Sequence, residues 1–370
     1  MKRIPVTPRL DYREKIEALG FDFHGDYWRE EAYYHFTAEE TACLEEATNE
    51  AYHLYCEAAQ FIIEDNPEFM ERALNIPKEI GERIRASWDA DELSLYGRFD
   101  FILAKDGTPK ILEFNADTPT SLLEASVIQW QWKEDVFPEC DQFNGIHEGL
   151  VQSWKDIFPK KGEIYFAGAL ENNEDTGTLQ YLASTAMEAG FSTRVLDMQA
   201  LDLQNGRFFD PAGELVNRCF KLYPWEWMVD GCLAEMEWLE PIWKLVMSNK
   251  AILATLYELF PDSPYVLPCY LSRPRSGLFC KKPVFSREGH NVSVVDIRNW
   301  EEHVRIAETE GDYNTGAYVY QEYVEPTVYS GRYPVIGSWI IGGEAAGIGI
   351  RENRMEVTDN LSEFVPHIIG

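Results

Sequence analysis

Several features that mark common protein classes are missing from this 370-residue sequence. No run approaches the roughly 20 apolar residues that a membrane-spanning helix needs. The first fifteen residues, MKRIPVTPRLDYREK, lack the apolar centre of an export signal. Internal repeats, low-complexity tracts and long linkers are missing as well. We therefore expect a cytoplasmic, globular protein without a membrane partner.

Clusters of metal-binding cysteine or histidine are also missing. The seven cysteines stand singly, at positions 43, 56, 140, 219, 232, 269 and 280, and none forms a CxxC pair. The seven histidines show no HxxxH or HxxE grouping. Because zinc sites need such groupings and scattered thiols are typical of reducing compartments, we predict reduced, buried cysteines and no zinc site.

Basic residues are scarce. The chain has 33 Lys and Arg against 63 Asp and Glu, which gives a formal net charge of -30. Nucleic acid is therefore excluded as a partner, since phosphate binding needs a basic surface. A negative field attracts cationic ligands such as polyamines or basic amino acids. The same charge is also typical of an ordinary acidic, soluble protein.

The chain has enough apolar residues to form a large hydrophobic core, since 45% of its residues are hydrophobic and 14% are aromatic. The patterns predict a mixed α+β and α/β fold in four segments. These are a helical N-terminal scaffold, a hairpin followed by a helix, an α/β subdomain, and an α+β lobe that returns to the core, at residues 1–90, 91–150, 151–247 and 248–370.

The first segment is expected to be mainly helical. Thr37-Ala-Glu-Glu40 is a capping box, and apolar residues follow it at spacings of three or four. These residues are Leu44, Ala47, Ala51, Leu54, Ala58 and Ile62. Before them, Trp28, Tyr33, Tyr34 and Phe36 are interpreted as core, with the lining of a pocket as the alternative.

The third segment has the order strand, helix, strand, at residues 163–170, 178–189 and 192–196, which predicts a parallel pair. The connecting loop, residues 171–177, follows the carboxyl end of a strand, where open α/β sheets bind ligands. Its Glu174 and Asp175 could hold an amine, and an ordinary solvated loop explains them equally well. Further on, Asn205-Gly206 predicts a hairpin, and Glu226 lies within an aromatic run at 222–228.

The fourth segment reads as α+β. Asn249-Lys250 opens a helix that we expect to run to residue 260, and strands are expected at 277–283 and 318–324. Residues 335–341 and 345–350 flank Gly342-Gly343, which predicts another hairpin. This order is typical of a small nucleotide-binding lobe.

A hairpin at residues 97–115 carries the densest group of polar residues. Asp106-Gly107 marks the turn and pairs Asp100 with Glu113, and the period of two puts Glu113 and Asn115 on one face. Two carboxylates and an amide oxygen are ligands that suit Mg²⁺. Acidic residues at strand ends are more often merely solvated, but three converging oxygens favour a metal site.

The stretch after the hairpin, Thr118-Pro-Thr-Ser-Leu-Leu-Glu124, has the Ser-x-x-Glu pattern of a helix capping box at Ser121. The N-terminus of a helix beside a metal site is a favourable place for an anion.

A magnesium site of this kind usually serves a nucleoside triphosphate. Lys250 and Lys282 are suitable cations for its phosphates, and the loop at 286–289 with its Gly289 could cover them. Gln321, Glu322 and Tyr323 could meet an adenine ring. Arg98 and Arg351 could neutralise a phosphoryl group during its transfer. Each of these cations, taken alone, is more often an ordinary surface residue.

The motifs together resemble the synthetase part of the glutathionylspermidine synthase family, whose members have an ATP-grasp fold. The blocks that carry the resemblance cover about three quarters of the chain: GRFDF at 97–101, EFNADTPTSLLEA at 113–125, Asn-Lys at 249–250, KKPVFSREGHNV at 281–292, YVYQEY at 318–323, GIGIRE at 347–352 and FVPH at 364–367. The resemblance implies an ATP-dependent, ADP-forming acid–amine ligase that passes through an acyl phosphate.

The resemblance also implies roles for individual residues. Asp100, Glu113 and Asn115 would bind Mg²⁺, Lys250 and Lys282 would bind nucleotide phosphates, and Arg98 and Arg351 would hold phosphate and stabilise the transition state. Thr118, Thr120 and Ser121 would bind the carboxylate substrate. The lysines follow the acidic residues in sequence, which is similar to the permuted order of this family.

Departures from the family leave some points open. Bifunctional members carry an N-terminal amidase domain, and we expect this chain to lack amidase activity. The residues that would hold the cationic amine fall in variable regions, so Glu174, Asp175, Glu226 and Glu363 are only candidates. A metal-dependent hydrolase or kinase, or a regulator that binds nucleotide without catalysis, remain alternative interpretations.

Overall fold

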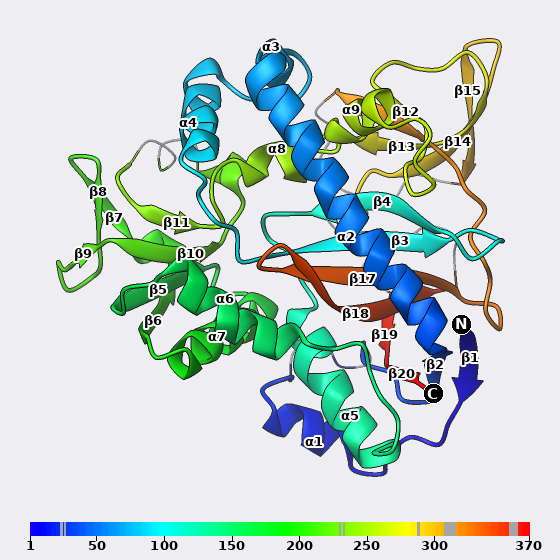
Figure 1. Cartoon of the computed structure of the whole chain (residues 1–370), viewed down its shortest axis with the longest axis horizontal. Coiled ribbons are helices and arrows are strands. Elements are labelled where there is room, and N and C mark those ends of the chain that lie inside the picture. Colours follow the sequence, from blue (N-terminus) through cyan, green and yellow to red (C-terminus); the bar gives the residue numbers. More distant parts are fainter. Residues whose placement is uncertain are drawn as a thin grey trace.

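The computed structural model describes residues 1–370 apart from 23, 24, 26, 229, 230, 232, 233, 287, 288, 307–315 and 355–361. The described residues form five β-sheets with helices around and between them (Figure 1). Two of these sheets, one central and one in the C-terminal lobe, enclose the candidate site.

The central sheet is antiparallel and has the strand order β19-β18-β17-β3-β4. Its strands are Glu363–Val365, Glu344–Asn353, Tyr333–Ile341, Tyr96–Leu103 and Pro109–Asn115. The expected hairpin is therefore formed by β3 and β4, and its register pairs Asp100 with Glu113 as predicted. The second expected hairpin is formed by β17 and β18.

Helix α2 (Ala38–Gln60) crosses one face of the central sheet (Figure 1). The Thr37 capping box forms as predicted, and the six apolar residues expected on the buried stripe are all buried. The Tyr55 ring packs edge-on against Phe99 and Phe114, at 5.2 and 5.3 Å. Because side chains alternate along a strand, the neighbouring Arg98 and Asp100 point to the opposite face.

The parallel sheet has the order β11-β10-β5-β6, with strands Glu237–Leu239, Arg218–Leu222, Glu163–Gly168 and Ser192–Asp197. Helix α7 (Asn173–Glu188) connects β5 to β6, which confirms the expected parallel pair. The small sheet β7-β8-β9 (Asp202–Gln204, Arg207–Phe209, Leu215–Val216) contains the Asn205-Gly206 hairpin.

The C-terminal lobe holds an antiparallel sheet of order β12-β16-β13-β14-β15. Its strands are Cys269–Tyr270, Tyr318–Glu322, Gly277–Pro283, Ser293–Arg298 and Glu301–Ile306. Two short helices, α8 (Lys244–Ser248) and α9 (Ile252–Leu259), lead into this lobe. The predicted strand at 277–283 therefore matches β13, and the predicted helix from 249 corresponds to α9.

Both termini meet in one small sheet, β1-β2-β20, formed by Lys2–Pro5, Ala32–Phe36 and His367–Ile369 (Figure 1). The first segment thus contains two strands beside its helices, which the helical interpretation missed. The other helices in the described residues are α1 (Tyr12–Ala18), α3 (Glu68–Arg72), α4 (Lys78–Asp89), α5 (Gln129–Val136) and α6 (Ile146–Ile157). They also include the π-helices η1 (Phe61–Asp65) and η2 (Glu124–Ile128) and the 3-10 turns η3 (Met198–Ala200) and η4 (Trp225–Trp227).

Three local expectations need correction. The loop expected at 171–177 is mostly helix, because the Asn172 side chain caps α7 and accepts a hydrogen bond from the Glu174 amide at 2.9 Å. The capping box expected at Ser121 is wrong, because Ser121 takes φ +66°, whereas an N-cap residue is extended. Of the six described cysteines, all free, only Cys219 and Cys269 are buried; the seventh, at 232, lies outside the described residues.

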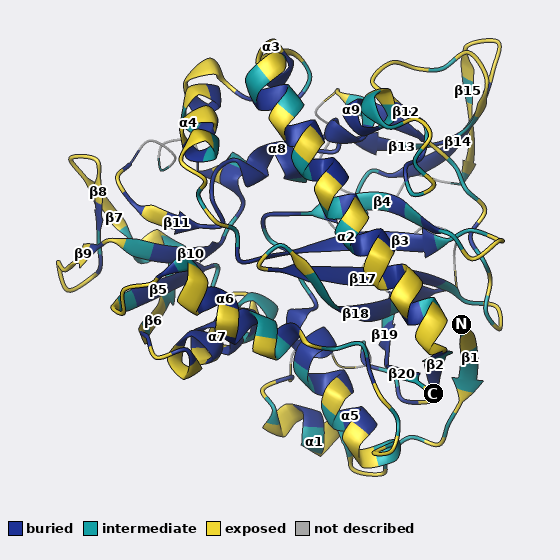
Figure 2. Cartoon of the chain, viewed as in Figure 1, coloured by how far each residue is buried: buried dark blue, intermediate teal, exposed yellow. Residues whose placement is uncertain are grey.

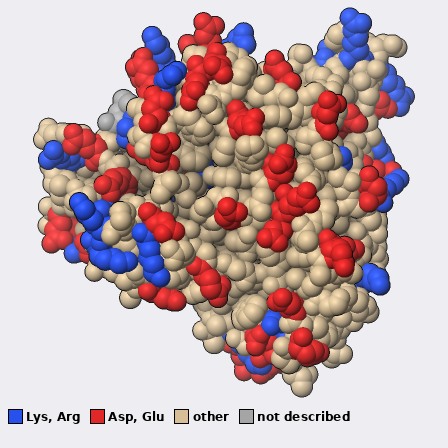
Figure 3. Space-filling model, in the orientation of Figure 1, with Lys and Arg blue, Asp and Glu red and all other residues tan. Residues whose placement is uncertain are grey.

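The outward side of α2 is solvent-exposed and its inward side is buried (Figure 2). The face of the molecule drawn in Figure 3 carries both acidic and basic side chains, and the chain as a whole has 63 Asp and Glu against 33 Lys and Arg. None of the described helices combines the length and the apolar character that a membrane span requires.

Candidate functional site

A cavity of about 320 Å³ opens beside the central sheet, on the face that α2 does not cover. Strands β3, β4, β17 and β18 form one wall, and β13 and β16 of the C-terminal lobe form the other. Fourteen of the predicted site residues line this cavity: Arg98, Asp100, Glu113, Asn115, Thr118, Thr120, Ser121, Glu174, Lys282, Gly289, Gln321, Glu322, Tyr323 and Arg351. Residues far apart in the sequence therefore share one cavity.

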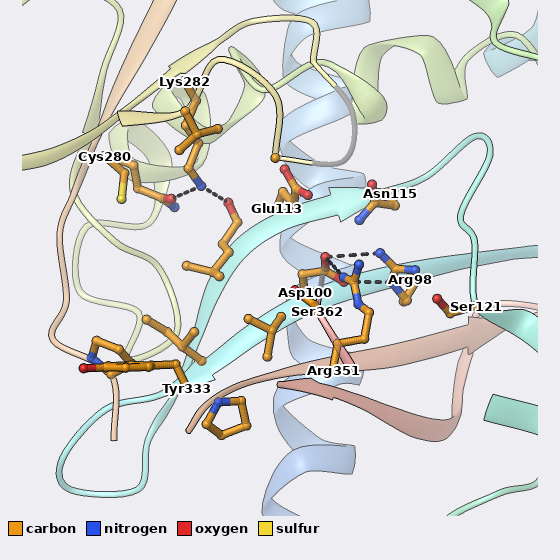
Figure 4. Close-up of a pocket in the computed structure, with 18 of the residues that line it drawn as sticks. Arg98, Asp100, Glu113, Asn115, Ser121, Cys280, Lys282, Tyr333, Arg351 and Ser362 are labelled. Carbon is orange, nitrogen blue, oxygen red and sulfur yellow. Dashed lines mark hydrogen bonds and ion pairs between the residues drawn. The ribbon is translucent and has the colours of Figure 1, made fainter. Parts of the chain in front are cut away.

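Two arginines converge on one carboxylate at the cavity floor (Figure 4). Arg98 donates from Nε and Nη2 to Asp100 at 2.7 and 3.2 Å, and Arg351 donates from Nη2 to Asp100 Oδ2 at 2.7 Å. Burial lowers the pKa of the Arg351 guanidinium, but the electrostatic interactions with Asp100, Tyr27 and Glu113 and the hydrogen bond to Asp100 together outweigh burial and raise the pKa above its usual value. Both arginines are therefore fixed cations that face the cavity.

Glu113 lies on the adjacent strand and pairs with Lys250, with Nζ 3.0 Å from Oε2. Burial raises the pKa of the Glu113 carboxyl, but the charges of Lys250 and Lys282 outweigh it and lower the pKa to about 2. Lys250 also donates to the Ser286 carbonyl at 2.7 Å. Lys250 thus joins the hairpin to the loop at 286–289, of which residues 287 and 288 lie outside the described residues.

Lys282 reaches the same area from β13. Its Nζ donates to the Leu112 carbonyl at 3.0 Å and to Gln321 Oε1 at 2.8 Å. The Gln321 amide nitrogen donates in turn to the Ile111 carbonyl at 2.9 Å. In this structure the Gln321 side chain therefore positions Lys282, while Glu322 and Tyr323 line the cavity beside apolar residues such as Leu267 and Val335.

The donor set fits a hard cation. Among the described residues, no three His, Cys, Asp or Glu side chains gather in one place, and the predicted set contains two carboxylates and one amide. Asn115 Nδ2 is buried and has no hydrogen-bond partner in the described part of the chain. Nδ2 is a donor, so it suits an anionic group such as a phosphate, whereas the Asn115 oxygen and the two carboxylates are hard oxygen ligands of the kind that Mg²⁺ takes. The residues therefore fit Mg²⁺.

The turn that follows Asn115 lines the side of the cavity next to the arginines. Arg98 Nη1 donates to the Thr120 carbonyl, and Asp117 is paired with the buried Lys221 of β10. The Ser121 hydroxyl lies 2.9 Å from the Tyr27 hydroxyl. The turn is thus tied to the central sheet, to the parallel sheet and to the N-terminal segment.

The four candidate amine-binding residues lie at different places in the structure. Glu174, in the first turn of α7, lines the large cavity with Ser121 and Arg351. Glu226 lines a smaller hollow of about 30 Å³ that shares Glu113, Asn115 and Thr118 with it and also contains Lys250. Asp175 lines neither of these two cavities, and Glu363 is engaged by Arg29 and Arg332.

Some cavity residues were missed by the sequence interpretation. Tyr27, Cys280, Tyr333 and Ser362 line the cavity but carry no motif of their own. Tyr27 stands directly before Trp28, which is buried as the core interpretation expects. The aromatic residues singled out from the sequence, Trp28, Tyr33, Tyr34 and Phe36, did not include Tyr27 and gave no signal that their neighbour lines the cavity.

Fold and site together describe a mixed α/β protein with a charged cavity between two antiparallel sheets. The whole chain, residues 3–370, matches the family described as glutathionylspermidine synthase preATP-grasp. The chain belongs to this family, as its motifs predicted. Its relatives are synthetases and ligases, so the chain is an enzyme of the ligase class.

Three relatives illustrate the range of the family. The chain is 36% identical to a Haemophilus influenzae protein described as a candidate acid–amine ligase, with 99% of both chains covered. It is 28% identical to trypanothione synthetase of Crithidia fasciculata over 84% of this chain and 52% of that protein. It is 25% identical to the bifunctional glutathionylspermidine synthetase/amidase of Escherichia coli over 97% of this chain and 63% of that protein.

Among solved structures, the fold is similar to a glutathione synthetase-like effector from Globodera pallida. The TM-score is 0.60 at 12% identity, with 98% of this chain and 96% of that chain covered. This likeness supports the mixed α/β architecture across the chain.

Proposed function

We propose that this chain is an ATP- and Mg²⁺-dependent acid–amine ligase of ATP-grasp fold that forms an amide through an acyl phosphate. The observation that carries the proposal is the convergence of Arg98, Arg351 and Lys282 with Asp100, Glu113 and Asn115 on one cavity. The relatives named as synthetases of glutathionylspermidine and trypanothione support a small peptide acid and a polyamine as the substrate classes.

In the first step, an oxygen of the substrate carboxylate attacks the terminal phosphorus of ATP, and ADP leaves. Lys250 and Lys282 bind the phosphates, and Arg98 and Arg351 face the charge that develops during transfer. Asp100, Glu113 and Asn115 would hold Mg²⁺, which would offset phosphate charge when bound. Because Asp100 fixes both arginines, they need little reorganisation as charge develops.

In the second step, the amine nitrogen attacks the acyl carbon, phosphate leaves, and the nitrogen loses a proton. Glu174 lines the same cavity as Ser121 and Arg351, so we propose it as the residue that attracts the cationic amine. The strongly negative chain favours the approach of such a substrate. Glu226, which lines the neighbouring hollow, is the second candidate, and Asp175 is less well placed.

The test is ADP release measured for a matrix of peptides and amino acids crossed with amines, in which glutathione with spermidine is one pair. A ligase releases ADP only when both an acid and an amine are present. ADP release with the acid alone would indicate a kinase or a hydrolase. ATP binding without ADP release for any pair would indicate a non-catalytic nucleotide-binding protein.

A further inference from the structure

Tyr27 brings the N-terminal segment into the cavity. Its backbone carbonyl accepts a hydrogen bond from the Phe364 amide at 2.9 Å, and the Arg29 amide donates to the Phe364 carbonyl, also at 2.9 Å. Phe364 on β19 is the register partner of Arg351 on β18. Tyr27 therefore lies next to the strand that neighbours Arg351, although 324 positions separate Tyr27 from Arg351 in the sequence.

The ring of Tyr27 packs against two other aromatic rings. It packs edge-on against Phe364 at 6.2 Å and in a tilted arrangement against Phe21 at 6.4 Å. The neighbouring Trp28 ring also stacks on Phe364, at 5.7 Å. Rings that are held in this way lose little further freedom when a ligand binds, so a hydroxyl that they carry is pre-organised.

The hydroxyl of Tyr27 points to the turn that is expected to hold the acid. It lies 2.9 Å from Ser121 Oγ, and both residues line the cavity with Thr118, Thr120 and Arg351. Ser121 takes φ +66°, a conformation that few side chains other than glycine favour, so its hydroxyl is held there at a cost in backbone strain. Strain of this kind is concentrated at binding sites.

The paired hydroxyls can donate to an anion. Each hydroxyl carries one proton, so one can donate within the pair while the other donates to a bound ligand. Burial raises the pKa of the Tyr27 phenol, and the charge of Glu124 raises it further, so that the phenol stays protonated at neutral pH. The phenol is therefore a donor at neutral pH, and a carboxylate is a suitable acceptor.

We propose that Tyr27 is an additional substrate-binding residue, whose hydroxyl acts with that of Ser121 to hold the carboxylate end of the acid. The inference rests on the proposed function, because it assigns the acid to the turn at residues 118–121. It adds a contribution from the N-terminal segment to a site that is otherwise built from the central sheet, the turn at 118–121, the start of α7 and the C-terminal lobe.

The experiment replaces the hydroxyl and keeps the ring. Tyr27→Phe should raise the KM for the acid by about tenfold, as expected when a hydrogen bond to a charged group is lost, and leave the KM values for ATP and the amine within twofold. Steady-state ADP release would be measured with the most active acid–amine pair of the matrix, beginning with glutathione and spermidine. Thermal unfolding would check that the variant is folded.

Two further variants separate binding from packing. Tyr33→Phe removes a phenol hydroxyl from β2, where the ring packs against Trp132 and Phe137, and should leave all three KM values unchanged. Ser121→Ala should raise the KM for the same acid, and the Tyr27→Phe/Ser121→Ala double variant should lose less than the product of the single effects.

The outcomes are distinguishable. An active wild-type enzyme with an unchanged KM for the acid in Tyr27→Phe would overturn the role of Tyr27 and leave the ligase intact. A wild-type protein that releases no ADP with any pair would overturn the proposed function, and this inference with it. Equal changes in all three KM values would assign Tyr27 to packing alone and overturn its binding role.

Discussion

Asp100 accepts hydrogen bonds from two guanidinium groups, and the two arginines differ in the hydrogen bonds that each makes to the protein. Arg98 donates two hydrogen bonds to Asp100 and a third to the Thr120 carbonyl. Arg351, on a strand that is distant in sequence, donates to Asp100 at 2.7 Å. At the scale of single residues, Arg351 is therefore the cation with more capacity for substrate. Its removal leaves Asp100 paired with Arg98.

Replacing Arg351 should affect turnover more than ATP binding. Arg351→Ala is expected to lower kcat by about 100- to 1,000-fold, since it removes a charge that is needed most in the transition state. The KM for ATP should change by less than about threefold. Arg298→Ala removes an exposed arginine paired with Asp296 and should change neither value. Steady-state ADP release measures both, and a large loss of ATP affinity at unchanged kcat would assign Arg351 to ground-state binding.

The Glu113 carboxylate gives a second prediction at this scale. Its pKa of about 2 means that it is ionised throughout any practical assay range, so turnover should not depend on its titration between pH 5 and 8. Glu113→Gln keeps the shape but removes the charge, and it should lower Mg²⁺-dependent ADP release by at least about 100-fold.

The control is Glu325→Gln, which removes an exposed carboxylate paired with Lys105. Titration of ADP release with Mg²⁺ should be unaffected in this control, and the thermal unfolding of both variants should resemble that of the wild type. Full activity in Glu113→Gln would end the assignment of Glu113 to the metal.

At the scale of elements, strand β17 leaves space for a site residue at one position, Gly337. A Cβ atom added at Gly337 would lie 2.8 Å from Arg98 Cδ and 3.3 Å from Arg98 Nε. Gly337 is the register partner of Asp100, so the strand leaves space for the Arg98 side chain to lie across it. A glycine within a strand often marks such a close approach.

Gly337→Ala should therefore displace Arg98 and lower kcat by about tenfold, while overpacking costs about 1–3 kcal/mol of the free energy of unfolding. Urea unfolding and ADP release measure the two effects. Gly81→Ala in α4 is the control, because its added Cβ would lie 3.4 Å from the flexible end of Met70. An active Gly337→Ala enzyme with wild-type kcat would show that Arg98 does not need its present position.

At the scale of the whole molecule, the small sheet β1-β2-β20 joins the two ends of the chain and contains a buried histidine. His367 Nδ1 lies 2.9 Å from Gln129 Oε1, and the ring packs edge-on against Phe36. Burial lowers the pKa of His367 to about 3. The histidine is therefore neutral in the folded protein at pH 7.

This histidine predicts a loss of stability in mild acid. Between about pH 6.5 and pH 3, the unfolded chain binds a proton at His367 that the folded protein does not, so the free energy of unfolding falls as the pH falls through this window. The contribution of His367 approaches about 1.4 kcal/mol per pH unit and vanishes above about pH 6.5.

Urea unfolding at several pH values measures this slope. His367→Asn should flatten it between pH 6.5 and 4, and His53→Asn, at an exposed position on α2, should leave it as in the wild type. An unchanged slope in His367→Asn would show that His367 is protonated in the folded protein.

The success of the sequence-based predictions depended on how far apart in the sequence the interacting residues lie. The β3–β4 hairpin was predictable because Asp106-Gly107 fixes the turn and pairs Asp100 with Glu113, and the period of two assigns Glu113 and Asn115 to one face. Helix α2 was predictable because its cap and its apolar stripe are both local. The start of α7 was missed because Asn172, rather than a later residue, caps it. The role expected for Gln321 at adenine stays a prediction, as do the four domain boundaries.

The sequence by itself determined the β3–β4 hairpin, helix α2, the excess of acidic charge and the motifs that identify the family. It did not determine that Arg351 meets Asp100, 251 positions earlier, or that Tyr27 meets Ser121 across 94 positions. These contacts depend on the pairing of β17 with β3 and of β18 with β19, and strand pairing over such separations leaves no local pattern. The hairpin at 97–115 thus supplies the carboxylates, while tertiary packing decides which cations and hydroxyls surround them.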